Sequence, residues 1–176
     1  MIDFKVTSSK KELEQILELQ QRNLPKNLSE EEMQTQGFVT VEHNYDILYQ
    51  MHEVHPHVIA VADGNVVGYV LSMSKSFGNS IPVLVPMFKE LENIDIHPNY
   101  IVMGQVCVDK NYRGKGVFRG LYAKMKAVFT DDFKSIITEI DALNTRSLNA
   151  HEAVGFSEIC EYEAGGQLWK VVAMDI

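Results

Sequence analysis

The sequence is poor in cysteine: its 176 residues include only two, Cys107 and Cys160. Both lie in stretches with the composition of strands, so we expect small, reduced core residues and neither a disulfide nor a nucleophile. Long hydrophobic runs are missing too, because no apolar stretch approaches the roughly 20 residues that cross a membrane. The first residues, Met1 to Lys5, lack the pattern of a signal peptide. These features favour a cytoplasmic protein that has no membrane as partner.

Positive charge is also in short supply. The chain carries 16 lysines and arginines against 24 aspartates and glutamates, which gives a net charge of −8 at pH 7. Such a surface repels the backbone of nucleic acids, which we therefore do not expect as partners, and it attracts cationic amines. Repeats, linkers and low-complexity tracts are absent as well, and the length suits one packed core. We therefore predict one domain over residues 1–176.

The stretch from Gln105 to Phe118 carries the strongest signal in the sequence. Residues 101–108 are apolar and rich in β-branched side chains, which predicts a buried strand. A basic, glycine-rich loop follows at residues 113–116. Beyond this loop, apolar residues recur at the spacing of an amphipathic helix: Val117, Phe118, Leu121, Tyr122, Met125, Val128 and Phe129.

The loop has the properties of a phosphate site. The free N–H groups and the dipole at a helix N-terminus favour an anion. Gly114 and Gly116 allow a ligand to approach the backbone closely. Arg113 and Lys115 add positive charge beside it. A Walker motif is excluded because Val117 follows Gly116 where that motif needs lysine, and the glycine spacing also misses the G-x-G-x-x-G of dinucleotide folds.

The loop resembles the pyrophosphate-binding motif of the GNAT superfamily of acyl-CoA-dependent N-acetyltransferases, Q/R-x-x-G-x-G/A. Arg113 and Gly116 match this motif, and Phe118 stands where the family usually has Gly or Ala. The resemblance covers residues 101–176 firmly and the first hundred residues in layout only.

A second stretch, residues 144–156, resembles the later family motif N-x-x-A-x-x-x-Y-x-x-x-G-F. The matching residues are Asn144, Gly155 and Phe156. Ser147 replaces the alanine of the motif, and His151 replaces its tyrosine. Asn144 suits the N-cap of a short helix and Gly155 its C-terminal end.

The order of elements and the resemblance predict one fold class: an α/β single domain, GNAT-like, with a mixed, mostly antiparallel sheet and flanking helices. Capping boxes begin at Ser9 and Ser29, and hairpin turns are expected at Gly64-Asn65 and Gly165-Gly166. Strands are expected over residues 3–7, 57–63, 66–74, 101–108, 135–140, 157–163 and 168–173. Helices are expected after Ser9, after Ser29, over 45–54, over 82–93, after Gly116 and over 144–154.

The resemblance also implies a cofactor, acetyl-CoA, which would leave as CoA. In the family, the central strand pairs with the pantetheine arm and polarises the thioester carbonyl, which places that role on Val106, Cys107 and Val108. Asn144 would bond the same arm. The pyrophosphate would lie on the backbone of Gly114, Lys115, Gly116, Val117 and Phe118, with Arg113 beside it.

Two residues are candidates for proton transfer. His151 occupies the position of the family tyrosine that protonates the leaving thiolate; it either takes over this role or only packs against the cofactor. Glu139, near the end of a strand beside the expected site, is a candidate general base. Asp141 and Gln105 lie nearby, and a water relay is an open alternative.

Other groups invite weaker interpretations. Four histidines gather between residues 43 and 57, but Pro56 interrupts the helix and no cysteine or paired carboxylate completes a set, so we expect no metal. Side chains that either line an acceptor pocket or belong to the core are Tyr45, Tyr49, Met87 and Phe88.

Two functions follow from this sequence. The first is an acetyl-CoA-dependent N-acetyltransferase that modifies a primary amine of a small molecule or peptide in a ternary complex. The second is a non-catalytic acyl-CoA-binding sensor or regulatory module, which the missing tyrosine motivates. The family suggests a homodimer as a further possibility.

Overall fold

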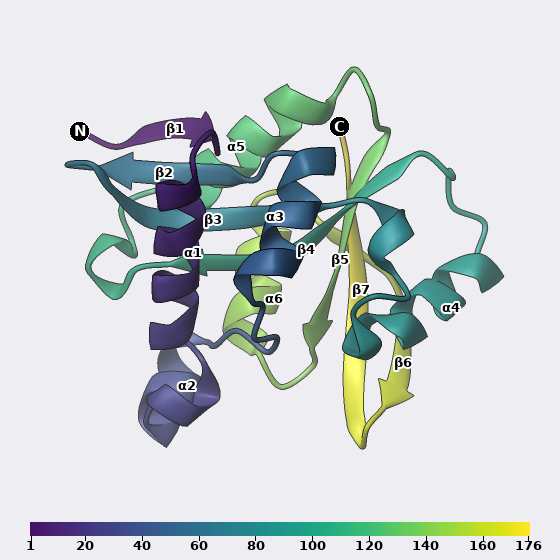
Figure 1. The fold of residues 1–176 in the computed structure, drawn as a ribbon. Coiled ribbons are helices and arrows are strands. Elements are labelled where there is room, and N and C mark those ends of the chain that lie inside the picture. Colours follow the sequence, from purple (N-terminus) through teal and green to yellow (C-terminus); the bar gives the residue numbers. More distant parts are fainter.

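Seven strands form one sheet in the order β1-β2-β3-β4-β5-β7-β6 (Figure 1). The computed structural model describes all residues, 1–176. Every neighbouring pair is antiparallel except β4 and β5, which run parallel, so the predicted mixed, mostly antiparallel sheet is confirmed. The strands are β1 (Asp3–Val6), β2 (Val58–Ala62), β3 (Asn65–Met73), β4 (Tyr100–Val108), β5 (Ser135–Asp141), β6 (Ser157–Ala164) and β7 (Gln167–Asp175).

Helices cover both faces of this sheet. Along β3, Tyr69 packs with α1 on one face, whereas the next residue, Val70, packs with α5 on the other, because successive side chains of a strand point to opposite sides. Helix α3 shares the face of α1, and α4 packs beside β6 (Figure 1). The helices are α1 (Lys10–Arg22), α2 (Glu30–Gln36), α3 (Tyr45–Val54), α4 (Val85–Asn93), α5 (Val117–Phe129) and α6 (Thr145–Glu152). None of them is long and apolar enough to cross a bilayer.

The local signals of the sequence place most element ends correctly. Ser9 and Ser29 each accept a hydrogen bond from the backbone of the glutamate three residues later, as a capping box requires. The first hairpin differs by one residue from the prediction. Its central residues are Asp63 and Gly64, with φ of 50° and 77°, and Asn65 already begins β3. Both φ values lie in the left-handed region that a tight hairpin turn needs.

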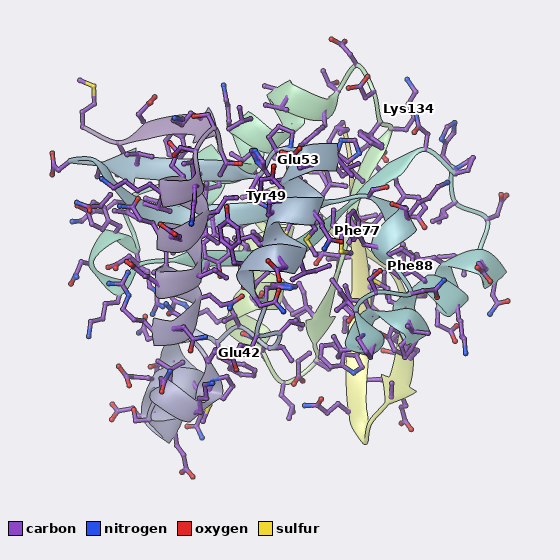
Figure 2. The ribbon with its side chains drawn as sticks, viewed as in Figure 1. Glu42, Tyr49, Glu53, Phe77, Phe88 and Lys134 are labelled. Atoms are coloured by element: carbon purple, nitrogen blue, oxygen red, sulfur yellow. The ribbon has the colours of Figure 1, made fainter.

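The predicted helix over residues 82–93 has two parts. A short 3₁₀ turn (Pro82–Leu84) leads into α4, and Met87 on α4 is fully buried in the core. Figure 2 shows Phe88 on α4 and Tyr49 on α3. Tyr49 is 43% exposed and stacks on Tyr45 at 6.0 Å between ring centroids. None of these four side chains lines the cavities described below.

The sheet opens between its two parallel strands. β4 and β5 pair only where Tyr100–Val102 faces Ser135–Ile137, and beyond that point they run apart (Figure 1). At the same place the register of β4 against β3 shifts between Met103 and Val106, which is a β-bulge. A bulge bends its strand and increases the local twist. The last residues of β4 therefore leave β5, and a space opens inside the sheet.

Candidate functional site

A cavity of about 350 Å³ lies beside the end of β4. The N-terminus of α5, helix α6 and the segment before residue 40 form its other walls. Nine predicted cofactor residues are among the 21 residues that line it: Asn23, Gln36, Gly37, Phe38, Val39, Val106, Cys107, Val108, Tyr112, Arg113, Gly114, Gly116, Val117, Phe118, Arg119, Asn144, Arg146, Ser147, Ala150, Ala153 and Val154. Two predicted cofactor residues, Lys115 and His151, are not among them.

One end of this cavity has the features of an anion site. Gly114 and Gly116 have φ of 71° and 78°, a conformation that favours glycine, and a side chain at either position would meet no atom within 4 Å. Gly116 is the N-cap of α5 and no side chain caps this helix. The first helical bond runs from the N–H of Gly120 to the carbonyl of Gly116, so the amides before Gly120 have no partner within α5.

The basic residues around this loop differ in their roles. Arg113 is fixed in place: its guanidinium donates to Val108 O at 3.1 Å, to Asn23 Oδ1 at 2.8 Å and to Gln36 Oε1 at 3.2 Å. It therefore ties the end of α1 and the end of α2 to the loop without a carboxylate partner. The Nζ atom of Lys115, a residue predicted to lie beside the phosphate, is 5.2 Å from the centroid of the Tyr112 ring, and Tyr112 itself lines the cavity.

Two arginines for which the sequence motifs predict no role line the cavity. Arg119 stands in the first turn of α5 and Arg146 in the first turn of α6. A signal for both was present, since each lies two or three residues beyond a helix cap, Gly116 or Asn144. Only the placement of the two helices shows that these arginines reach one cavity.

Val106, Cys107 and Val108 do not all direct their backbone N–H and C=O groups to the same side of β4. The N–H of Asp109 donates to Val67 O on β3, so alternate residues of β4, including Cys107, direct their backbone groups at β3. Val106 and Val108 direct theirs away from β3 into the opening, where Val108 O accepts from Arg113. The thiol of Cys107 is buried, and burial raises its pKa to about 12. Because the N–H of Val106 points away from β3, it is free to donate to a ligand in the opening.

A second, smaller cavity of about 80 Å³ fills the opening between β4 and β5. It is lined by Phe38, Val39, Thr40, Val41, Val83, Leu84, Met103, Gly104, Gln105, Val106, Thr138, Glu139, Ile140, Asp141, Asn144, Ser147, His151 and Trp169. No lysine or arginine is among these residues. Five residues line both cavities, and we call them the junction: Phe38, Val39, Val106, Asn144 and Ser147.

Two carboxylates of β5 face the second cavity. Glu139 accepts a hydrogen bond from the hydroxyl of Tyr162, and burial raises the pKa of Glu139 to about 7 although this hydrogen bond lowers it. Asp141 accepts from Leu143 N at 2.9 Å and from Gln167 Nε2 at 3.1 Å. Glu139 thus has the acid strength of a group that gains and loses a proton near neutral pH.

His151 is enclosed between helices α5 and α6. Its Nδ1 lies 2.7 Å from the carbonyl of Ser147, and its Nε2 lies 2.7 Å from the hydroxyl of Tyr122. The ring also packs edge-on against Phe118 at 5.1 Å. Only 1% of the residue is exposed, and burial lowers its pKa to about 4, so the imidazole is neutral near pH 7. Both nitrogens are engaged within the protein, and the residue lines the second cavity but not the first.

A segment that matches no sequence motif forms a wall of both cavities. Residues 38–43 cross the opening and are held by hydrogen bonds at Val39, Val41 and His43. Gln105 Nε2 donates to Val41 O at 2.7 Å, while its Oε1 accepts from Tyr69 at 2.6 Å. Gln20 bonds both backbone groups of His43, and Val39 N donates to Asn23 O at 3.1 Å.

The histidines of this region do not form a metal site. His52 Nδ1 bonds Thr7 Oγ1 at 2.8 Å, His57 Nε2 donates to Leu48 O at 3.1 Å, and His55 packs against Phe129. No group of three His, Cys, Asp or Glu side chains lies close enough together to hold a metal ion.

A model of the acetyltransferase (GNAT) family matches residues 13–156 of this chain. The chain belongs to the GNAT family. The resemblance read from the two motifs is thereby confirmed, and the predicted fold class with it. Members of the GNAT family use acetyl-CoA as the acetyl donor.

Solved structures share the GNAT fold of this chain. The ribosomal-protein-S18-alanine N-acetyltransferase from Escherichia coli matches with a TM-score of 0.67 and 12% identity, over 100% of this chain and 94% of that one. A chain of the NatC complex, bound to Gag peptide and CoA, matches with a TM-score of 0.66 and 16% identity, over 99% of this chain and 98% of that one. A GNAT acetyltransferase from Streptococcus agalactiae matches with a TM-score of 0.66 and 11% identity, over 99% of this chain and 95% of that one. No curated protein sequence showed a significant match.

Proposed function

We propose that this protein transfers the acetyl group of acetyl-CoA directly to a primary amine of a small molecule or peptide, within a ternary complex. Residues 1–176 would act as one acetyltransferase domain. The observation that carries this proposal is the junction: a cavity suited to CoA and a cavity with an ionisable carboxylate meet at five residues, Phe38, Val39, Val106, Asn144 and Ser147. Two substrates held in these cavities would meet there.

The first cavity supplies the groups that CoA needs. Bound acetyl-CoA brings an activated acetyl thioester to the site. The free amides after Gly116 and the guanidinium groups of Arg119 and Arg146 would hold its pyrophosphate. The backbone of Val106 and Val108 and the side chain of Asn144 would hold its pantetheine arm.

The free amide of Val106 is the candidate for polarising the thioester carbonyl. Its N–H points into the opening between β4 and β5 and has no partner on β3. A fixed N–H group stabilises negative charge that develops on a carbonyl oxygen, and removal of one such donor typically costs about a hundredfold or more in rate. The rigidity of the sheet keeps this donor in place before the reaction.

Glu139 is the candidate general base. An alkylamine of pKa about 10.4 is neutral only to roughly one part in a thousand at pH 7, so a base at the site helps to form the nucleophile. Glu139 lines the second cavity and its pKa is raised to about 7 by burial, which suits this task. The neighbouring Asp141 and the lack of any lysine or arginine favour a cationic amine over an acidic one.

The proposal is tested by the release of CoA thiol from acetyl-CoA with a panel of amines. Cationic primary amines should raise the rate above the slow hydrolysis without an amine, and amino compounds with net negative charge should be poorer substrates. Replacement of Glu139 by Gln should lower kcat by about a hundredfold or more, the usual contribution of a general base. Equal rates with and without every amine would contradict the proposal.

A non-catalytic acyl-CoA binder is the second candidate, and one observation favours it. The family tyrosine is replaced by His151, and both nitrogens of His151 are engaged inside the protein. Acetyl-CoA binding is common to both candidates and does not separate them. A binder would show saturable acetyl-CoA affinity with no amine-dependent thiol release, whereas an enzyme shows both.

A further inference from the structure

The hydroxyl of Ser147 lies where the two cavities meet. Ser147 and Asn144 are the only polar side chains among the five junction residues. Asn144 lies against the segment at Gly37, and its Oδ1 already accepts the N–H of Ser147 at 3.2 Å as the cap of α6. Ser147 Oγ has one close polar neighbour in the protein, Nδ1 of His151, at 3.3 Å.

The surroundings of His151 decide what this hydroxyl can do. A carbonyl oxygen only accepts hydrogen bonds, so the 2.7 Å contact between Nδ1 and Ser147 O requires that Nδ1 carries the proton. In the neutral ring Nε2 is then an acceptor, and the hydroxyl of Tyr122 donates to it at 2.7 Å. Because Nδ1 already bears a proton, Ser147 cannot donate to it. The O–H of Ser147 is left free to donate into the junction.

We infer that the hydroxyl of Ser147 donates a hydrogen bond to the sulfur that leaves acetyl-CoA. This inference rests on the proposed acetyl transfer. In that step the amine nitrogen bonds to the acetyl carbon, the carbon–sulfur bond breaks, and the sulfur keeps the electron pair of that bond. Glu139 takes the proton of the amine. Ser147 keeps its own proton and stabilises the negative sulfur through the hydrogen bond. The CoA thiolate then leaves the protein and takes a proton from water.

His151 and Tyr122 are positioning residues for this hydroxyl. The carbonyl of Ser147 fixes the tautomer of His151, and the hydroxyl of Tyr122 holds the ring in place through Nε2. The ring lies one helical turn after Ser147 in α6, against the carbonyl and the hydroxyl of Ser147.

The pKa of the CoA thiol bound to the protein tests this inference without turnover. A hydrogen bond to the thiolate favours the charged form and lowers that pKa. Hydrogen bonds to charged groups are typically worth a factor of about 10 to 100 in an equilibrium. With Ser147→Ala, the pKa of bound CoA, read from the ultraviolet absorbance of the thiolate, should rise by about 1 to 2.

Matched ligands and variants separate the hydroxyl from its surroundings. CoA affinity of Ser147→Ala at a pH above the thiol pKa should fall by about 10 to 100-fold, while affinity for desulfo-CoA, which lacks the sulfur, should stay within about twofold. Ser147→Thr keeps a hydroxyl and should restore most of the thiol pKa shift. His151→Phe should raise the thiol pKa in the same direction as Ser147→Ala. Glu139, Asp141 and the cavity arginines are unchanged in all three variants.

Identical thiol pKa values for wild type and Ser147→Ala would overturn the inference, as would an equal loss of affinity for CoA and desulfo-CoA. These results are independent of the amine. A wild-type protein that acetylates no amine but shows the Ser147-dependent thiol pKa would contradict the proposed function alone. Amine-dependent turnover with no effect of Ser147→Ala on the bound thiol would contradict the Ser147 inference alone.

Discussion

Tyr162 on β6 donates a hydrogen bond to Glu139 on β5, across the intervening strand β7. Two effects act on this carboxyl in opposite directions. Burial raises its pKa, because the charged form loses solvation, and the hydrogen bond from Tyr162 lowers it. Burial is the stronger effect, and the pKa settles at about 7. Glu139 is therefore protonated below neutral pH and becomes a base above it.

This pair predicts how the pH profile of the enzyme responds to a mutation outside the cavity lining. The value of kcat/KM should rise with pH through a midpoint near 7 as Glu139 ionises. Tyr162→Phe removes a donor that favours the charged carboxylate, so the midpoint should move to higher pH. Glu139→Gln is the control, because it should abolish this limb altogether. A midpoint that is the same in wild type and Tyr162→Phe would show that another group sets the profile.

The glycine at the start of α5 predicts where the cofactor is held. Acetyl-CoA should raise the melting temperature of the wild type, since a ligand that binds only the folded state stabilises it. Gly116→Asp should abolish this rise, because it places a carboxylate at the anion site. Gly165→Asp is a matched control, with a similar left-handed φ of 61° and the same open space around an added side chain, but outside both cavities. Loss of the rise in both variants would point to backbone strain as the cause.

Gly120 has a different task from the two loop glycines. A Cβ at position 120 would overlap the ring of Phe4, so the absence of a side chain on this residue lets the ring of Phe4 on β1 pack directly against α5. Gly120→Ala should lower the free energy of unfolding by about 1 to 3 kcal/mol, the usual cost of overpacking. In a Phe4→Ala background the same change should instead stabilise by about 0.5 to 1 kcal/mol, since alanine is the better helix former. Urea unfolding of the four proteins measures both values, and an equal effect in the two backgrounds would contradict this contact.

Most of the fold could be predicted from the sequence because its signals are local. The capping boxes at Ser9 and Ser29 and the glycines of the second hairpin act within a few residues of themselves. The first hairpin shows the limit of such signals, since Asp63-Gly64 and Gly64-Asn65 are both good turn pairs. Only the pairing of β2 with β3 selects the former.

The site was predictable only where one continuous stretch forms it. The loop around Gly116 is such a stretch, whereas Arg119 and Arg146 meet in the cavity through the packing of two helices. The partners of His151 could not be read from the motif, because Tyr122 stands 29 residues earlier on another helix. The second cavity depends on the bulge of β4, which no residue pattern in the sequence predicts.

Direct transfer is tested most closely by whether the kinetics require a ternary complex or a covalent acetyl-protein intermediate. Initial rates should be measured while acetyl-CoA and one cationic amine are both varied. Transfer across the junction requires both substrates on the protein at once, so the double-reciprocal lines should intersect and acetyl-CoA alone should leave no acetyl group on the protein. Parallel lines, with an acetylated residue such as Cys107 detected by mass spectrometry, would show a covalent route and contradict direct transfer.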